Sequence, residues 1–395
     1  MAAPLTPPPL GLYIHLPWCV QKCPYCDFNS HALRGELPEQ AYVDALLRDA
    51  DREAAAAAGR EVETLFIGGG TPSLFSADAI QTLLDGLRQR LNIARDAEIT
   101  LEANPGTLES GRFEGFLAAG INRLSIGVQS FNDQHLHRLG RIHGGDEATD
   151  AIATAQRAGF ERINVDLMHG LPGQSPADAL ADVERVLALG IEHLSHYQLT
   201  LEPGTAFHAR PPALPDDDQL ADIETACAER IHAAGLRRYE VSAWATPGDE
   251  CRHNLNYWRF GDYLAIGAGG HAKLSDADGG IRRYRKQHLP RLYQEQAGTD
   301  AATVEVRAIT PDERPLEYLM NALRLTDGTD MQAAMARTGL PASAFEPGLS
   351  EARRRGLLID DPTRLQATPL GQRFLNDLLD VFLDAETPAN RVNAG

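Results

Sequence analysis

The chain has 395 residues, of which 43% are hydrophobic and 23% charged, so it can bury a large core and is expected to form two domains. A formal net charge of -18 at pH 7, with no compensating run of Lys or Arg, argues against a nucleic-acid partner. Residues 1–10 lack the pattern of a signal sequence, and no apolar run is long enough to cross a bilayer. We therefore expect a cytoplasmic protein without a transmembrane segment.

Short strand-forming runs recur through the first half of the chain, and each but the last is followed by a helix-like segment. These helical segments include the alanine-rich residues 44–58 and a segment capped by Ser175 that has Leu and Val at helical spacing. Strands and helices that alternate through short connections predict an α/β fold, with a mainly parallel sheet covered by helices. The predicted strands are residues 12–16, 64–67, 99–102, 123–128, 162–167 and 193–199.

Polar or glycine-rich residues stand at the ends of four of these strands. Gly-Gly-Gly-Thr at 68–71 follows the second strand, and Glu102, Gln129 and Asp166 end the next three. Ligands gather at the carboxyl ends of parallel strands in such folds. Any one of these residues alone is more often an ordinary turn or cap. Together they predict one rim that carries functional groups.

A second region is expected from about residue 303. Thr310 and Glu313 form a capping-box signature ahead of apolar residues at helical spacing. Residues 357–367 predict a short hairpin and Thr368 the start of a last helix, which together indicate a helical, winged-helix-like module. The predicted division is a flexible N-terminus at 1–10, a core at 11–300, a helical domain at 301–385 and a flexible tail at 386–395.

Three of the five cysteines form a Cys-x-x-x-Cys-x-x-Cys motif at Cys19, Cys23 and Cys26, directly after the first predicted strand. Thiols clustered in this way in a long chain indicate a metal site rather than a set of disulfides. Three thiolates can hold an iron-sulfur cluster and leave one iron open to a chelating small molecule. A structural zinc ion is the alternative, but it needs a fourth ligand. The candidates for that ligand are His15, Asp27 and His31.

The motif and its surroundings resemble the radical SAM superfamily, where SAM is S-adenosylmethionine. The resemblance is carried by Tyr-Ile-His-Leu-Pro-Trp-Cys at 13–19, by Tyr25 and by Gly-Gly-Gly-Thr-Pro at 68–72. More narrowly, residues 11–385 resemble the oxygen-independent coproporphyrinogen III oxidase group. This resemblance implies a partial, open, parallel (β/α)6 barrel and a 4Fe-4S cluster on the three cysteines, with its open iron chelated by SAM. The resemblance further implies that an electron from the cluster splits the sulfonium to a deoxyadenosyl radical, with a reductant as a partner.

The resemblance also implies a SAM-binding site, position by position. Glycines let a backbone approach a ligand closely, and Glu102 can accept hydrogen bonds from amino or hydroxyl groups. Arg141 can hold a carboxylate through two parallel hydrogen bonds, although a surface ion pair is the commoner arrangement for an arginine. The matching positions are Tyr13, Tyr25, Gly69, Gly70, Thr71, Glu102, Gln129, Arg141 and Asp166.

Two features separate this chain from the oxidases themselves. Phe28 stands where the oxidases carry a fourth cysteine, and the first strand begins by residue 12, without their longer N-terminal segment. Cys-Asp-Phe at 26–28 and His-Asn-x-x-Tyr-Trp at 253–258 instead resemble the heme chaperones of this group. That resemblance implies heme binding and transfer of heme to an acceptor hemoprotein. The alternatives are decarboxylation of coproporphyrinogen III and a heme-binding module whose cluster is only structural.

The resemblance to the heme chaperones makes His253 the expected heme ligand. A neutral imidazole is a good axial ligand for heme iron, and the rings of Tyr257 and Trp258 can stack on a porphyrin. The alternative is a hydrogen-bonded core histidine, with the two aromatic residues packing beside it. Cys227 and Cys251 are expected to be buried, inert thiols.

Overall fold

The computed structural model describes residues 7–106 and 111–385. Its largest element is a twelve-stranded sheet with the order β14-β13-β12-β11-β1-β4-β5-β6-β7-β8-β10-β9. Six consecutive strands of this order run parallel to one another and correspond to the six strands predicted from the sequence. They are β1 (Leu10–Leu16), β4 (Glu61–Gly69), β5 (Asn92–Ala103), β6 (Arg123–Gln129), β7 (Arg162–His169) and β8 (His193–Gln198).

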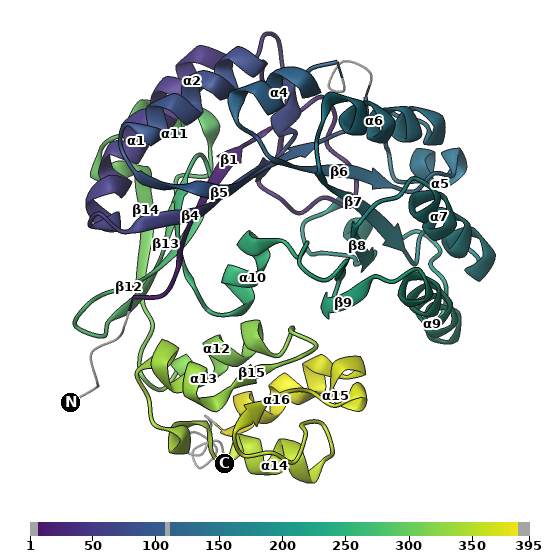
Figure 1. Ribbon diagram of the computed structural model, residues 1–395, viewed down its shortest axis with the longest axis vertical. Coiled ribbons are helices and arrows are strands. Elements are labelled where there is room, and N and C mark those ends of the chain that lie inside the picture. The colour runs from purple at the N-terminus through teal and green to yellow at the C-terminus, as the bar shows by residue number, and fades with distance from the viewer. Residues whose placement is uncertain (1–6, 107–110, 386–395) are drawn as a thin grey trace.

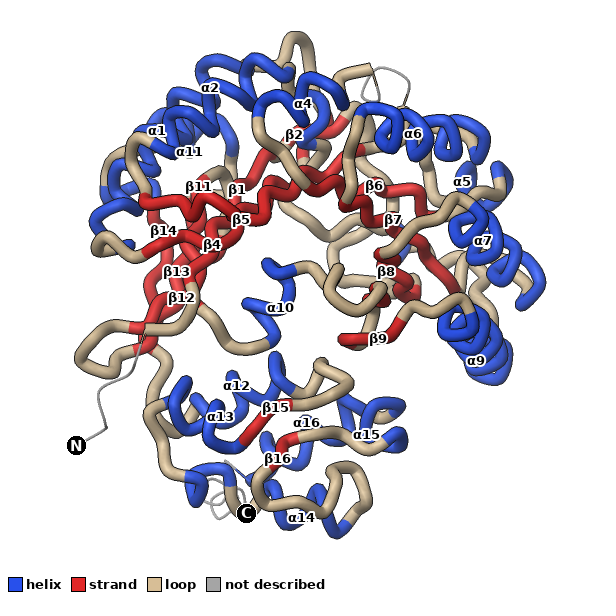
Figure 2. Tube along the Cα trace, viewed as in Figure 1, coloured by secondary structure: helices blue, strands red, loops and turns tan. Residues whose placement is uncertain are grey.

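Further strands extend the sheet at both ends. Beside β1 lies the parallel strand β11, which is followed by three antiparallel strands, while two antiparallel strands follow β8. The outermost strands β14 and β9 are not neighbours, so the sheet curves without closing, as predicted for a partial barrel (Figure 2). The added strands are β11 (Asp262–Ile266), β12 (His271–Ser275), β13 (Ile281–Lys286), β14 (Thr303–Ala308), β10 (Ala243–Ala245) and β9 (Arg237–Glu240).

Helices line the outer side of the curved sheet (Figure 1). Some of them begin at side-chain caps: Ser175 Oγ accepts a hydrogen bond from the Asp178 N–H, as predicted. One helix, α10 (Arg252–Trp258), lies instead on the inner side of the arc (Figure 1). The outer helices are α1 (Glu39–Ala57), α2 (Ala77–Arg88), α4 (Phe113–Ala119), α5 (Asp133–Arg138), α6 (Gly145–Ala158), α7 (Pro176–Ala188) and α9 (Asp217–Ala233).

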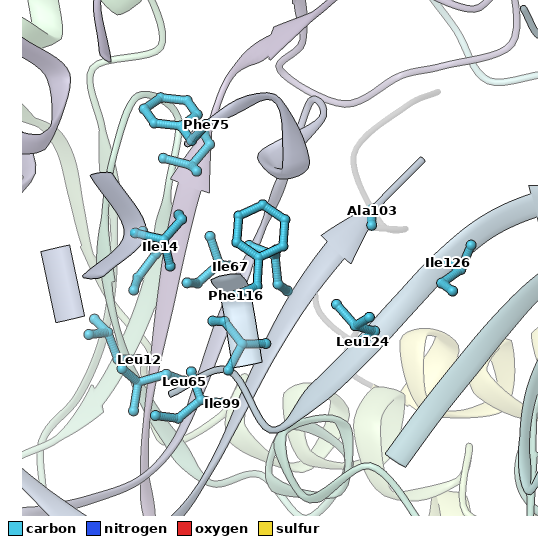
Figure 3. Close-up of a cluster of buried hydrophobic side chains, with 14 of the residues drawn as sticks. Leu12, Ile14, Leu65, Ile67, Phe75, Ile99, Ala103, Phe116, Leu124 and Ile126 are labelled. Atoms are coloured by element: carbon cyan, nitrogen blue, oxygen red, sulfur yellow. The ribbon is translucent and has the colours of Figure 1, made fainter. Parts of the chain in front are cut away.

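The main core lies between the sheet and these outer helices. Figure 3 shows Ile14 of β1, Ile67 of β4, Ile99 of β5 and Leu124 of β6 on the same side of the sheet as Phe116 of α4. All five side chains are buried. Burial of each contributes roughly 1.5–3 kcal/mol. This packing fixes the relative positions of the strand ends that carry the polar residues.

The C-terminal region forms a second, mostly helical core, as predicted. The hairpin near residues 357–367 is present as a bridge between Leu358 and Ala367. Thr310 and Glu313 do bond to each other, but the helix starts later than predicted, at Arg314. A helix that began at residue 311 would need a backbone N–H at Pro315, which proline lacks. The elements are α12 (Arg314–Ala322), β15 (Thr329–Asp330), α13 (Met331–Thr338), α14 (Gly348–Arg354), β16 (Arg364–Leu365), α15 (Pro369–Arg373) and α16 (Leu375–Ala385).

The predicted division into domains stays a proposal. β14 belongs to the large sheet although it follows residue 300, and the second core takes Phe260 and Ile281 from the first region. Of the predicted flexible N-terminus, Leu10 already lies in β1 and residues 7–9 are described without regular secondary structure, while residues 1–6 lie outside the described part, as does the predicted tail at 386–395. Across the described ranges, no helix combines the length and apolar character needed to span a membrane.

Candidate cluster and cofactor site

A cavity of about 490 Å³ opens at the carboxyl ends of the parallel strands. Gly69, Glu102, Gln129 and Asp166, from four successive parallel strands of the sheet, all line it, so the structure brings the predicted rim together. The three cysteines of the motif lie on the same cavity. Of the residues predicted to hold the cluster, SAM or the heme iron, Tyr13 and His253 do not line it.

The cysteine motif occupies the start of a loop beside this cavity. Cys19 ends the short strand β2 (Trp18–Cys19), which pairs with β3 (His31–Ala32). Cys23 and Cys26 lie in the loop between these strands, and all three thiols are free. Burial raises the pKa of the Cys19 thiol. Metal binding requires loss of the thiol proton, so a bound metal would have to offset this effect.

The donor set fits an iron-sulfur cluster better than a zinc ion. Both ring nitrogens of His15 are already engaged, with the Tyr13 hydroxyl and the Asn29 carbonyl, each at 3.0 Å. His31 Nε2 lies 3.2 Å from Asn29 Oδ1. These two candidates for a fourth zinc ligand are therefore held by other partners, and the third, Asp27, is exposed and does not line the cavity that the three cysteines share. Three thiols on one cavity wall match a cluster whose fourth iron faces the cavity.

Backbone geometry explains the glycine motif after β4. Gly69 has φ +120°, and a Cβ at this position would lie 2.7 Å from the His15 ring. At Gly70 an added Cβ would lie 2.5 Å from the Trp18 carbonyl oxygen. The motif therefore passes very close to the segment that leads into the cysteine loop, which only glycine permits. The Thr71 N–H donates to the Trp18 carbonyl at 2.7 Å and so ties the two segments together.

Two half-buried carboxyl groups, those of Glu102 and Asp166, face the cavity. Burial, together with the nearby Asp166, raises the pKa of Glu102 to about 8, although the Gly69 N–H donates to Glu102 Oε2 at 3.0 Å. Burial also raises the pKa of Asp166, against hydrogen bonds from Asn164 and Ser125. A cationic or hydroxyl-bearing ligand placed between these groups would favour their charged forms.

Arg141 is not the surface ion pair that its residue type alone would favour. Its Nη2 donates to the Gly127 carbonyl at 2.6 Å and to Asn104 Oδ1 at 2.8 Å, and its Nη1 lies 3.8 Å from Cys23 Sγ. Among the residues that the structure describes, no carboxylate lies within ion-pair distance of this guanidinium. A half-buried cation without a counter-ion favours an anionic ligand beside it.

Several cavity residues were not predicted from the sequence. Asn104 follows Glu102 at the end of β5, and Tyr197 lies near the end of β8, where its hydroxyl donates to Gln129 Oε1 at 2.7 Å. The strand-end rule that identified Glu102 applies to both. Arg324 reaches the cavity from the loop after α12, and no local sequence signal indicates this.

A second, larger cavity of about 830 Å³ adjoins the first. The two share a wall made by Phe28, Gly69, Glu102 and Trp258. Tyr13 lines this second cavity rather than the first. The side chain of Phe28 is 61% exposed, which is unusual for a large apolar residue.

His253 is fully buried and lines neither cavity. Its Nδ1 lies 2.8 Å from Thr64 Oγ1 and its Nε2 lies 2.8 Å from the Tyr257 hydroxyl. This is the hydrogen-bonded core arrangement that the sequence left as the alternative. Ligation of heme by His253 stays a prediction, and it requires the ring to give up one of these bonds. Burial raises the pKa of Cys251 and of Cys227 to about 12, in line with inert thiols.

An open parallel barrel with three free cysteines and a glycine motif at one rim defines the class: this is a radical SAM protein. The family model of the Radical SAM superfamily matches residues 13–186, and that of the HemN C-terminal domain matches residues 309–374. The chain belongs to the HemW family. It is 52% identical to heme chaperone HemW of Escherichia coli (strain K12) over 376 residues, which cover 95% of this chain and 98% of that protein.

Other comparisons agree with this assignment. Heme chaperone HemW of Haemophilus influenzae is 46% identical over 383 residues, covering 96% of this chain and 99% of the relative. The solved structure of coproporphyrinogen III oxidase (HemN) from Escherichia coli superposes with a TM-score of 0.81. That structure is 24% identical and covers 95% of this chain and 90% of its own, so it shows the same fold.

Proposed function

We propose that this chain binds heme and transfers it to acceptor hemoproteins, with the cluster and SAM site controlling or driving the transfer. Relatives of nearly the same length carry the name heme chaperone. The observation that carries the proposal is Phe28, an exposed aromatic side chain on the wall between the two cavities. At the position where the oxidases have a fourth cysteine, this chain offers a surface for a flat ring.

The first cavity has the residues that a cluster and SAM require. Cys19, Cys23 and Cys26 would hold the cluster, and the guanidinium of Arg141, which has no carboxylate partner among the described residues, suits the carboxylate of SAM. Glu102 can accept hydrogen bonds from amino or hydroxyl groups. When both groups are bound, the chemistry supplied is one-electron reduction of a sulfonium. We propose a cytoplasmic location, because free thiols of this kind are kept in reducing compartments.

Hydrogen bonds within the chain hold the side chains of this proposed site in position. The Gly69 N–H holds Glu102 in place, and the Tyr197 hydroxyl holds Gln129. Arg141 spans from the end of β6 to the cysteine loop through Gly127 and Cys23. In this proposal the site needs an external reductant and an acceptor hemoprotein as partners.

Oxidative decarboxylation of coproporphyrinogen III is the other candidate, since the HemN fold is the same. One anaerobic sample, reconstituted with iron and sulfide, separates the two. Given coproporphyrinogen III, SAM and reductant, it should form no protoporphyrinogen; given hemin, it should show a shifted Soret band. Turnover of coproporphyrinogen, or an unshifted hemin spectrum, would contradict the proposal.

A further inference from the structure

The second cavity has the size and walls that a flat aromatic ligand needs. Its volume of about 830 Å³ lies within the usual range of roughly 300–1,000 Å³ for small-molecule sites. Phe28, Tyr257, Trp258 and Tyr263 line it, and Tyr257 and Tyr263 meet edge to face with ring centroids 4.5 Å apart. Trp258 Nε1 is buried without a hydrogen-bond partner among the described residues. Four aromatic side chains therefore form much of the wall of a cavity of this size.

Cationic side chains stand on the same cavity. Lys22 is exposed, and within the described ranges its ammonium group donates to the carbonyls of Phe28 and Ser30. Arg285 of β13 forms a loose pair with Glu305 at 3.3 Å, and its Nε is buried without a partner in the described part of the chain. Among the exposed residues that line this cavity, the anionic one is Asp27. Two carboxylates on one edge of a flat ligand could form ion pairs with both cationic side chains, Lys22 and Arg285.

One histidine on this cavity has free ring nitrogens and a fixed backbone. His271 opens β12, is exposed and makes no side-chain hydrogen bond or ion pair with any described residue. Its strand lies between β11 and β13, and His271 pairs in register with Arg285. His288 also lines the cavity, but it lies between β13 and α11 (Pro290–Gln296), outside the regular strands. His15 has no free ring nitrogen.

We infer that heme binds in this second cavity, with its ring against the aromatic residues of α10, His271 as an iron ligand and its propionates at Arg285 and Lys22. The inference rests on the proposed function and names its heme site. The shared wall at Phe28 and Trp258 then places the porphyrin directly beside the cluster cavity. His253 becomes a positioning residue, because its bond to the Tyr257 hydroxyl holds one wall of the site.

Spectra at saturating hemin distinguish a ligand from a positioning residue. The reconstituted full-length protein is titrated with hemin, alongside His271→Ala, His253→Gln and the control His232→Ala, an exposed histidine on α9 that lines neither cavity. His271→Ala should move the Soret band at saturation and remove the spectral features of a histidine-ligated ferric iron. His253→Gln should weaken binding but keep the wild-type band at saturation, and His232→Ala should change neither.

Two results would overturn the inference while leaving the proposed function intact. One is a wild-type spectrum in His271→Ala; the other is loss of the histidine-ligated signature in His253→Gln or in a matched His288→Ala variant. If the wild-type protein binds no hemin at all, the proposed function fails first, so the two failures are distinguishable.

The propionate contact has its own test. Arg285→Gln should raise the dissociation constant of hemin about tenfold, the equivalent of roughly 1.4 kcal/mol. It should leave the affinity for hemin dimethyl ester, which lacks both negative charges, unchanged. Equal loss for hemin and its ester, or no loss for either, would show that Arg285 does not face the propionates.

Discussion

Glu102 illustrates how single residues combine structure and chemistry in this site. Its carboxyl group accepts the Gly69 N–H, which holds the glycine motif, and it lies on the wall shared by the two cavities. Without a ligand, this half-buried group lies near another carboxyl group, that of Asp166. The residue is therefore placed to respond to whatever enters either cavity.

The raised pKa of Glu102 predicts a pH dependence of stability. In the unfolded chain a Glu loses its proton near pH 4.3, whereas in the folded protein the pKa of Glu102 is about 8. The folded state thus binds more protons between these values, so the free energy of unfolding falls as the pH rises through this window. Urea denaturation of ligand-free Glu102→Gln should show a smaller fall than the wild type. An exposed control, Glu161→Gln, should follow the wild type; a wild-type slope in Glu102→Gln would contradict the prediction.

Gly69 should tolerate no side chain. Gly69→Ala forces φ +120° on alanine and places its Cβ 2.7 Å from the His15 ring, so we expect a loss of roughly 2–3 kcal/mol in the free energy of unfolding. The control Gly190→Ala has φ +69° but an added Cβ with no atom within 4 Å, and should lose about 1 kcal/mol. Chemical denaturation measures the free energy of unfolding of both variants. Equal losses would mean that the contact with His15 does not destabilise Gly69→Ala.

At the scale of elements, the six parallel strands were predictable because each one is a local apolar pattern bounded by turn residues. The strands β11 to β14 were not. In β13, Arg282, Arg283 and Arg285 interrupt the apolar pattern. The residue type of Lys286 predicts an exposed position, although Lys286 is buried. Only the tertiary fold, which brings Lys286 to the carboxylates of α1, makes this segment a buried strand.

The Lys286 ion pairs tie this part of the sheet to α1, and they predict a strong effect. Lys286 Nζ lies 2.7 Å from both Asp49 and Glu53, and all three are buried. Lys286→Met leaves two buried carboxylates without a counter-ion and should cost about 3–5 kcal/mol of unfolding free energy. Removal of an exposed pair by Arg291→Ala should leave thermal stability nearly unchanged. Similar melting temperatures for both variants would show that the buried pairs do not stabilise the β13 attachment.

At the scale of the molecule, the rim was predicted because it follows from a topological rule, whereas the second cavity was not. Its walls come from the cysteine loop, α10, β11, β12 and β13, far apart in sequence. Because α10 lies on the inner side of the sheet (Figure 1), Tyr257 and Trp258 of the His-Asn-x-x-Tyr-Trp motif line the cavity, whereas His253 is buried and does not. Sequence alone identified the motif but not which of its side chains lines the cavity.

We expect this radical SAM frame to deliver heme instead of transforming a porphyrin. The most direct measurement follows heme from the loaded, reconstituted protein to an apo-cytochrome under anaerobic conditions, with SAM and reductant present or absent. The acceptor should gain its heme spectrum faster than from free hemin, and Arg141→Gln, which alters the proposed SAM site, should slow this gain. Heme that stays on the protein, or an acceptor that fills no faster than from free hemin, would show that the chain does not deliver heme.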